Sequence, residues 1–271
     1  MEFMKFEAAG NDFILIDGMG FGGAWREPMG RMREVAPIWC DRHKGIGADG
    51  ILVVTQPLSR EAVARMNIIN ADGSMASMCG NGIRCVARWL DEKGIVASPL
   101  PIAIETEGGI HRVLRMGEAD DGMFDVEMAR VDVVGTCEIA RDGHVWRGIE
   151  VNVGNPHAVF ECENPREALV ESGSFLSHHP HFPDRCNVEF IREVTPETLE
   201  FYVYERGVGP TLACGTGCVA AATAFVHRHG LAGKRIEIHA PGGRLFVETP
   251  ASGEGKVHLQ GPARFSFKGT I

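Results

Sequence analysis

The sequence predicts an α+β fold made of two related halves, on three observations. Strand-like segments outnumber helical ones and do not alternate with them as βαβ units, which is typical of α+β folds. Two stretches, 70–85 and 205–218, both contain Cys-Gly-x-Gly and both lead into an apolar segment of helical length. The second of these helices, 215–229, is apolar nearly all round, so we expect it to be buried inside a curled sheet.

The first half is expected to begin with two strands within residues 1–16, joined by a Gly-Asn turn, and then a helix over 27–40 whose end Pro37 disturbs. The glycines of 45–50 formally match a dinucleotide-binding fingerprint. A strand-like segment follows them where that motif needs a helix, so we expect a tight turn and no nucleotide site. Further strands are expected at 51–54, 64–69, 102–106 and 111–116, with the helix after Cys79 stopping at Gly94.

The second half repeats this plan around the helix that starts at Cys214. Its strands are expected at 124–128, 149–153, 188–191, 199–204, 236–239, 245–248 and 257–259. The Gly- and Asp-rich segment Gly117–Gly122 is the expected hinge. It predicts an N-terminal half over 1–120, completed by a C-terminal strand at about 260–271, and a C-terminal half over 121–259.

Composition excludes several classes of protein. A hydrophobic share of 44% and a charged share of 23% are those of a soluble globular protein, and a net charge of −9 argues against binding to nucleic acid or an anionic membrane. No apolar run has the length of a transmembrane helix, and without a signal-peptide pattern the mature protein is expected to start at Met1. Eight cysteines do not form a disulfide framework in a chain of this size, so we expect reduced thiols and a cytoplasmic protein.

A cysteine followed by glycines and then a helix places its thiol at the helix N-terminus. Unpaired N–H groups and the positive end of the helix dipole face the thiol there, which is expected to lower its pKa and favour the thiolate. The same N–H groups can bind a carboxylate. We therefore single out Cys79 and Cys214 as reactive. The remaining cysteines are interpreted as packing residues: Cys40, Cys85, Cys137, Cys162, Cys186 and Cys218.

These motifs resemble those of the diaminopimelate epimerase family. The resemblance rests on Asn-x-Asp-Gly-Ser and Met-Cys-Gly-Asn-Gly-x-Arg-Cys within 70–85, and on Glu-Arg-Gly-x-Gly-x-Thr-x-Ala-Cys-Gly-Thr-Gly at 205–217. It extends from Gly-Asn-Asp-Phe at 10–13 to Gly-Pro-Ala at 261–263, so it covers essentially the whole chain. It implies two pseudo-symmetric halves, each a curled mixed sheet around a central buried helix, with the active site in the cleft between them. It also implies a cofactor-independent isomerase that interconverts LL- and meso-diaminopimelate for lysine and peptidoglycan precursor synthesis.

Removing an α-proton and returning one to the opposite face needs two groups on opposite sides of the carbon. One thiolate and one thiol suit this task because their roles exchange with the direction of reaction, and we assign them to Cys79 and Cys214. The sequence indicates no electron sink such as pyridoxal phosphate. Charge that develops on the α-carboxylate is expected to meet the N–H groups at the two helix starts, those of Gly80, Asn81, Gly215 and Thr216.

The resemblance implies further site residues. His157 is expected to tune one thiol, Glu205 to take an ammonium or help deprotonate a thiol, and Arg206 to capture a carboxylate. Polar contacts to the substrate are expected from Asn11, Asn70, Asn155 and Asn187. Without the motifs, these residues read as turn formers and a surface ion pair. The chain departs from the family at two positions. It has Gly50 where family members often have Gln, and Pro210 where they often have Glu.

Two alternatives stay open at this point. A related cofactor-independent racemase acting on another amino acid, such as histidine, shares the two-cysteine plan. A metal- or ligand-binding protein that kept the fold is the other, but neither the cysteines nor the histidines of 177–181 have the spacing of a known metal site, so no metal is expected. The expected partners are a small amino-acid substrate and a second copy of the chain in a homodimer.

Overall fold

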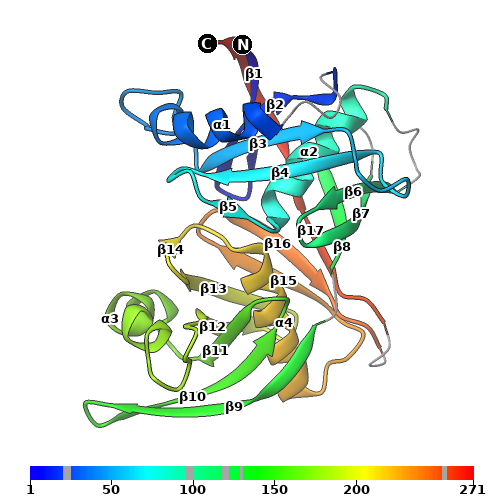
Figure 1. The fold of residues 1–271 in the computed structure, drawn as a ribbon. Helices are drawn as coiled ribbons and strands as arrows, with labels where there is room; N and C mark the ends of the chain where they lie inside the picture. The colour runs from blue at the N-terminus through cyan, green and yellow to red at the C-terminus, as the bar shows by residue number, and fades with distance from the viewer. Residues whose placement is uncertain (21–25, 96–100, 118–121, 129–130, 252–254) are drawn as a thin grey trace. The chain divides into compact units, whose positions relative to one another are not determined.

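The computed structural model describes residues 1–20, 26–95, 101–117, 122–128, 131–251 and 255–271 (Figure 1). Contacts between residues divide the chain into two compact units. Unit 1 is Met1–Val126 together with Gly261–Ile271, and unit 2 is Glu127–Gln260. The predicted boundary at 120/121, and the predicted hinge Gly117–Gly122 apart from its two end residues, fall on 118–121, which lie outside the described residues.

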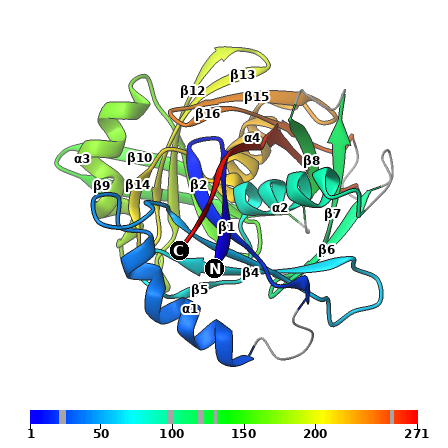
Figure 2. The same ribbon diagram turned by 90° about the horizontal axis from the view of Figure 1, so that it is seen from above.

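Unit 1 is a mixed sheet with two helices. Its elements are β1 (Glu2–Ala8), β2 (Asn11–Asp17), α1 (Arg26–Trp39), β3 (Gly50–Thr55), β4 (Ala64–Asn70), β5 (Met75–Ala76), α2 (Gly80–Glu92), β6 (Ile102–Thr106), β7 (Gly109–Met116), β8 (Met123–Glu127) and β18 (Arg264–Thr270). The sheet curls around α2, which packs against β1, β2, β3, β4, β6, β7 and β18 (Figure 2). The helix is buried because one face carries Ile83, Val86 and Leu90, all inaccessible to solvent.

Unit 2 has the same composition of elements. They are β9 (Asp132–Arg141), β10 (His144–Asn152), β11 (Pro156–Glu161), α3 (Pro165–Ser177), β12 (Asn187–Thr195), β13 (Thr198–Glu205), β14 (Gly209–Thr211), α4 (Gly215–His229), β15 (Arg235–Ala240), β16 (Gly243–Glu248) and β17 (His258–Pro262). Its central helix is α4, which packs against β9, β10, β11, β12, β13, β15 and β16. Burying a side chain such as Phe225 of α4 contributes about 1.5–3 kcal/mol.

The two units share one pattern of strand pairing. In unit 1, β1–β2 is antiparallel, β2–β3 parallel, β3–β4 and β4–β5 antiparallel, β4–β6 parallel, and β6–β7 and β7–β8 antiparallel. In unit 2 the same sequence of orientations runs through β10–β11, β11–β12, β12–β13, β13–β14, β13–β15, β15–β16 and β16–β17. The predicted α+β class with two related halves is therefore confirmed, and each half holds its own curled sheet and helix.

Both central helices stop where the sequence predicts. Gly230 follows α4 with φ +68°, a left-handed conformation that glycine adopts without strain, and its N–H donates to the carbonyl of Val226. Gly94 has φ +66° just after α2. Within the described residues no helix has the length and apolarity to cross a membrane.

Several elements differ from the prediction. The helix α3 was not predicted, although Asn164 and Pro165 are a typical helix start, because Ser172 and Gly173 interrupt its apolar pattern. Of the β9–β10 hairpin only 149–153 was predicted, although its Asp142–Gly143 turn, with φ of +49° and +80°, is a standard hairpin signal, and β11 was not predicted. The helix α1 includes Pro37.

Candidate functional site

Cys79 caps α2 in unit 1. Its backbone is extended, with φ −144° and ψ 113°, and its Sγ accepts a hydrogen bond from the N–H of Gly82 at 3.3 Å. The N–H groups of Gly80 and Asn81 belong to the first turn of the helix, which has no intrahelical acceptor for them. The cysteine is half-buried, so its thiol lies at a helix start that offers donors to an anion.

Cys214 caps α4 in the same way. Its φ is −126° and its ψ 119°, and its Sγ accepts from the N–H of Gly217 at 3.4 Å, with the hydroxyl of Thr216 also at 3.4 Å. The two thiols therefore occupy equivalent positions of the two units, at the start of the central helix. None of the eight cysteines forms a disulfide in the structure.

The expectation of a lowered thiol pKa is wrong for Cys214. Burial raises the pKa of this thiol well above its ordinary value, and the carboxylates of Glu205 and Glu189 raise it further. The hydrogen bonds from Thr216 and Gly217 act in the opposite direction but do not outweigh burial. The helix start alone does not decide the charge of a thiol that is 8% exposed.

A chain of hydrogen bonds surrounds the start of α2. Asn81 Nδ2 donates to Asn11 Oδ1 at 2.6 Å, and Asn11 Nδ2 donates to Asp49 Oδ2 at 3.0 Å. On the other side, Asn81 Oδ1 accepts from Arg84 Nη2 at 2.7 Å, and Arg84 is fully buried. Asn11 and Asn81, both predicted site residues, are thus held together, and a buried cation lies in the same helix as Cys79.

Asn70 and Glu205 occupy equivalent positions, each as the last residue of the strand that leads toward a cysteine. Asn70 Nδ2 donates to Ser74 Oγ at 2.9 Å across the turn. Glu205 accepts from the hydroxyl of Thr211 at 2.5 Å. Glu205 also lies close enough to Cys214 for its charge to act on that thiol.

The polar centre of unit 2 is His157, which is inaccessible to solvent at its side chain. Its Nε2 lies 2.9 Å from Asn155 Oδ1, and its Nδ1 lies 2.6 Å from Glu189 Oε1. Asn187 Nδ2 donates to the carbonyl of Pro156 at 3.3 Å and lies 3.5 Å from His157 Nε2. The predicted residues Asn155, His157 and Asn187 therefore form one cluster at the starts of β11 and β12.

Asn187 also fixes the backbone at Arg206. The N–H of Arg206 donates to Asn187 Oδ1 at 2.9 Å, and Arg206 Nη1 donates to the carbonyl of Asp184 at 3.3 Å. The Arg206 side chain is exposed, which leaves its guanidinium accessible to an anionic ligand.

Glu189 of β12 is the site residue that the sequence analysis missed. It is fully buried and is bonded to His157, and a Cβ built on Gly217 would lie 2.9 Å from its Oε1. The glycine at the third position of α4 is needed because the carboxylate approaches the helix start this closely. A lone glutamate within the apolar run Val188–Ile191 was the signal that could have revealed it.

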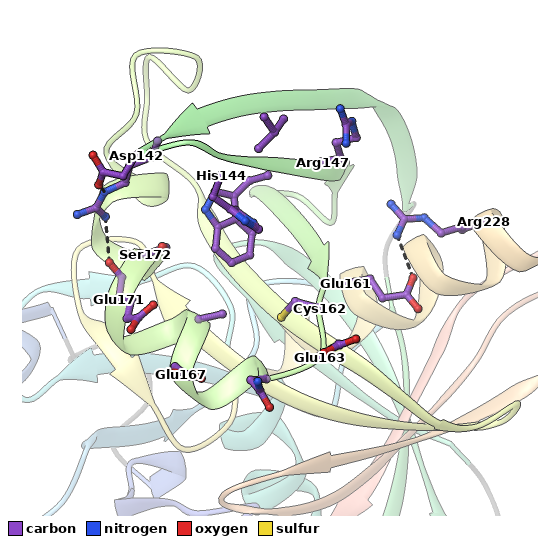
Figure 3. Close-up of a pocket in the computed structure, with 15 residues that line it drawn as sticks. Asp142, His144, Arg147, Glu161, Cys162, Glu163, Glu167, Glu171, Ser172 and Arg228 are labelled. Atoms are coloured by element: carbon purple, nitrogen blue, oxygen red, sulfur yellow. Dashed lines mark hydrogen bonds and ion pairs between the residues drawn. The ribbon is translucent and has the colours of Figure 1, made fainter.

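A separate hollow of about 1000 Å³ lies on unit 2 (Figure 3). It is lined by β10, the end of β11 and α3, with His144, Trp146 and Cys162 among its residues. Two of its charged side chains form an ion pair, in which Arg228 Nη1 donates to Glu161 Oε2 at 2.9 Å, as Figure 3 shows. No predicted site residue lines it.

One group of possible metal ligands lies next to that hollow. Ligand atoms of Glu161, Glu193 and His229 come within 4.8 Å of one another in the described part of the chain. Arg228 already forms an ion pair with Glu161, and its positive charge competes with the binding of a metal cation there. The group includes none of the predicted site residues.

Comparisons with known proteins connect these features to a family. A family model described as diaminopimelate epimerase matches residues 3–133 and 149–266. A diaminopimelate epimerase of Pelotomaculum thermopropionicum is 38% identical over 287 residues, covering 99% of this chain and 98% of that protein. One of Moorella thermoacetica is 38% identical over 285 residues, with coverage of 99% and 98%.

Solved structures share the fold at low identity. A PhzF-family phenazine biosynthesis protein of Bacillus anthracis superposes with a TM-score of 0.75 at 14% identity, covering 100% of this chain and 98% of that one. A probable proline racemase of Agrobacterium radiobacter K84 gives a TM-score of 0.74 at 16% identity, with coverage of 100% and 92%. These likenesses show a common two-unit fold.

Proposed function

The chain belongs to the diaminopimelate epimerase family, as its motifs predicted, and we propose that it interconverts LL- and meso-diaminopimelate by a two-base mechanism. It is an isomerase of lysine and peptidoglycan precursor biosynthesis. The family model and the relatives cover nearly the whole chain, so the activity is proposed for the protein as a whole. The proposed reaction uses no cofactor.

In the proposed mechanism one cysteine is a thiolate and the other a thiol. The thiolate takes the α-proton, so the C–H bond breaks and an S–H bond forms on one face of the substrate. The other thiol then gives its proton to the opposite face of the carbanion, which inverts the configuration and leaves the second sulfur as a thiolate. The reverse reaction exchanges the two roles.

The observation that carries this proposal is the repeated capping of a buried helix by a cysteine. Cys79 and Cys214 have the same backbone conformation and the same bond from the N–H three residues on. Each helix start also offers N–H groups that can stabilise charge on the substrate α-carboxylate, those of Gly80 and Asn81 in one unit and of Gly215 and Thr216 in the other. A thiol with such donors beside it suits proton transfer at an α-carbon.

The remaining polar residues support a substrate with two amino-acid ends. We propose that Arg206 binds the distal carboxylate, with Asn11, Asn70, Asn155 and Asn187 as hydrogen-bonding partners of the substrate. The exposed guanidinium of Arg206 supports its proposed role. The roles of Asn155 and Asn187 are supported by the cluster that both form with His157. Glu205 and His157 are proposed to tune the thiols. A distal carboxylate is the feature that separates diaminopimelate from lysine.

The test of this proposal is replacement of each cysteine by alanine. Cys79→Ala and Cys214→Ala are expected to abolish epimerisation while circular dichroism shows an intact fold. Cys85→Ala and Cys218→Ala are matched controls, because both residues lie inside the same two helices and are buried. These controls are expected to keep turnover. Near-normal turnover in either of the first two variants would remove the two-base mechanism.

We also propose that the protein is cytoplasmic and a homodimer. An apolar surface on β18 supports the dimer: Phe265 and Phe267 are 44% and 47% exposed. Light scattering after size exclusion is expected to give twice the chain mass, and a monomer at micromolar concentration would contradict this proposal.

A further inference from the structure

A buried acid–base pair connects two strands of unit 2. Glu189 and His157 are both inaccessible at their side chains, and Oε1 and Nδ1 lie 2.6 Å apart. The other oxygen, Glu189 Oε2, is buried with no hydrogen-bond partner among the described residues. Burying ionisable groups costs several kcal/mol per ion unless a partner compensates, so a chain does not place such a pair in its interior without gain elsewhere.

The pair holds the imidazole of His157 from both sides. Nε2 lies 2.9 Å from Asn155 Oδ1, and Nδ1 lies 2.6 Å from Glu189 Oε1. Burial raises the pKa of Glu189 above its ordinary value, while the neighbouring His157 acts to lower it. Glu189 thus holds the ring in one orientation.

Unit 1 shows that the fold does not need this pair. In the parallel pairing of β11 with β12 in unit 2, His157 stands opposite Asn187, the first residue of β12. In the parallel pairing of β2 with β3 in unit 1, Phe13 stands opposite Gly50, the first residue of β3. Two residues further along those strands lie Glu189 and Leu52. Leu52 also takes the place of Glu189 beside the helix: a Cβ on Gly82 would meet Leu52 Cδ2 at 3.1 Å. The equivalent apolar pair, Phe13 and Leu52, is buried and packs the same architecture.

The position of Glu189 relates it to the second thiol. The point that a Cβ on Gly217 would occupy is 2.9 Å from Glu189 Oε1 and 3.2 Å from the Cβ of Cys214. The groups that act on this thiol are the carboxylates of Glu189 on β12 and Glu205 on β13, with the hydroxyl of Thr216 and the N–H of Gly217. At the equivalent position beside Gly82 in unit 1 stands the apolar Leu52.

We infer that Glu189 is a positioning residue: it orients the imidazole of His157 through Nδ1 and sets the charge around Cys214, without touching the substrate. The inference rests on the proposed function of Cys214 and His157. A carboxylate beside Cys214 favours its protonated form, which is the form that donates a proton to the carbanion. Glu189 in this way contributes to the difference between the two thiols that a two-base mechanism needs.

Three variants test this inference. Glu189→Gln removes the charge and keeps the shape, Glu189→Asp keeps the charge and shortens the side chain, and Glu193→Gln removes an exposed carboxylate from the same strand. The rate at which iodoacetamide alkylates Cys79 and Cys214 is measured at several pH values by peptide mass spectrometry. For each variant kcat, KM and the melting temperature are also measured.

Glu189→Gln is expected to raise the alkylation rate of Cys214 at pH 8 severalfold, because one carboxylate that favours the thiol form is removed, and to leave Cys79 unchanged. Its kcat is expected to fall about 10–100-fold with little change in KM, as when a supporting partner of a functional histidine is lost. Glu189→Asp is expected to recover part of kcat, and Glu193→Gln to match the wild type. Wild-type kcat and wild-type Cys214 alkylation in Glu189→Gln would overturn the inference.

A double variant separates this role from packing. His157→Phe/Glu189→Leu rebuilds in unit 2 the pair that unit 1 uses, so it is expected to melt no lower than the wild type while turnover is lost. If Glu189→Gln lowers the melting temperature but alters neither kcat nor alkylation, the residue only packs, and the inference fails. Alkylation needs no substrate. A wild-type protein that does not epimerise diaminopimelate would overturn the proposed function, while the Cys214 response to Glu189→Gln would still test this inference.

Discussion

Alanine at Gly217 tests how closely the acid–base pair packs against α4. The added Cβ would lie 2.9 Å from Glu189 Oε1 and 3.2 Å from Phe201 Cζ. Glu189 is held by His157, and Phe201 is fully buried, so neither can move at low cost. Overpacking of a buried site costs about 1–3 kcal/mol, and the higher helix propensity of alanine returns only about 0.5–1 kcal/mol. We expect a net loss of about 1 kcal/mol in the free energy of unfolding, together with a loss of activity.

Gly82→Ala is the matched control, because Gly82 has the same position in α2. Its added Cβ would meet the flexible end of Leu52 at 3.1 Å and Cys79 at 3.5 Å, so we expect a free energy of unfolding within about 0.5 kcal/mol of the wild type. Urea titration followed by circular dichroism measures both variants. For a unit of this size, a difference of 1 kcal/mol corresponds to about 2–4 °C in Tm. Equal stability of the two variants, or a larger loss in Gly82→Ala, would refute the assignment of close packing to Gly217.

Three further predictions follow from the site and from unit 1. Arg206→Ala is expected to slow α-proton exchange of diaminopimelate and so to narrow the preference of the enzyme for diaminopimelate over lysine. If the wild type exchanged the α-proton of lysine at a comparable rate, diaminopimelate would not be the substrate. Mild oxidants are expected to inactivate the enzyme reversibly through a Cys79–Cys214 disulfide, with protection by substrate, and mass spectrometry without that link would contradict this. Glu105→Gln is expected to be less stable than the wild type at pH 7 in urea titrations, with the difference shrinking as the pH falls below the ordinary pKa of glutamate; a difference that does not shrink would contradict the electrostatic cause.

The Glu105 prediction follows from the sign of its pKa shift. Burial acts to raise the pKa of this carboxyl, but the N–H groups of Ser59 and Leu58 and the guanidinium of Arg65 outweigh it, so the pKa is lowered. A carboxyl whose pKa is lower in the folded state stabilises the fold above its unfolded pKa. That stabilisation is lost as the pH falls through the folded pKa. The window is therefore acidic, below the ordinary range of glutamate.

The cysteines and their helices could be predicted because their signals are local. A cysteine before Gly-x-Gly and an apolar run specifies a capped, buried helix, and the structure has this at both Cys79 and Cys214. Glu205, one of the two carboxylates that act on Cys214, was named from its motif, whereas Glu189 could not be predicted because it lies on another strand. The direction of the pKa shift of Cys214 depends on burial that only the packed unit creates.

The role of Glu189 could not be predicted from its own segment of the sequence. Its neighbours Val188 and Phe190 indicate a buried strand, and a glutamate there has meaning only beside His157, which is far away in sequence. The repeat between the units allows a comparison, because Phe13 and Leu52 of unit 1 stand where His157 and Glu189 stand in unit 2. These two apolar residues show which side chains the positions hold when they serve packing alone. The helix α3 and the strand β9 were not predicted, although a cap signal at Asn164–Pro165 and a turn signal at Asp142–Gly143 are present in the sequence.

The most direct measurement of the central claim is deuterium incorporation in the first turnovers. Purified enzyme is mixed with LL-diaminopimelate in deuterated water, and the α-positions of product and remaining substrate are followed by NMR. With two bases, the proton is taken by one thiol while the other delivers deuterium from solvent. The account predicts that the meso product carries deuterium from the start while the remaining LL substrate keeps its proton. A product that retains the original α-proton would show one base acting on both faces and would contradict the account.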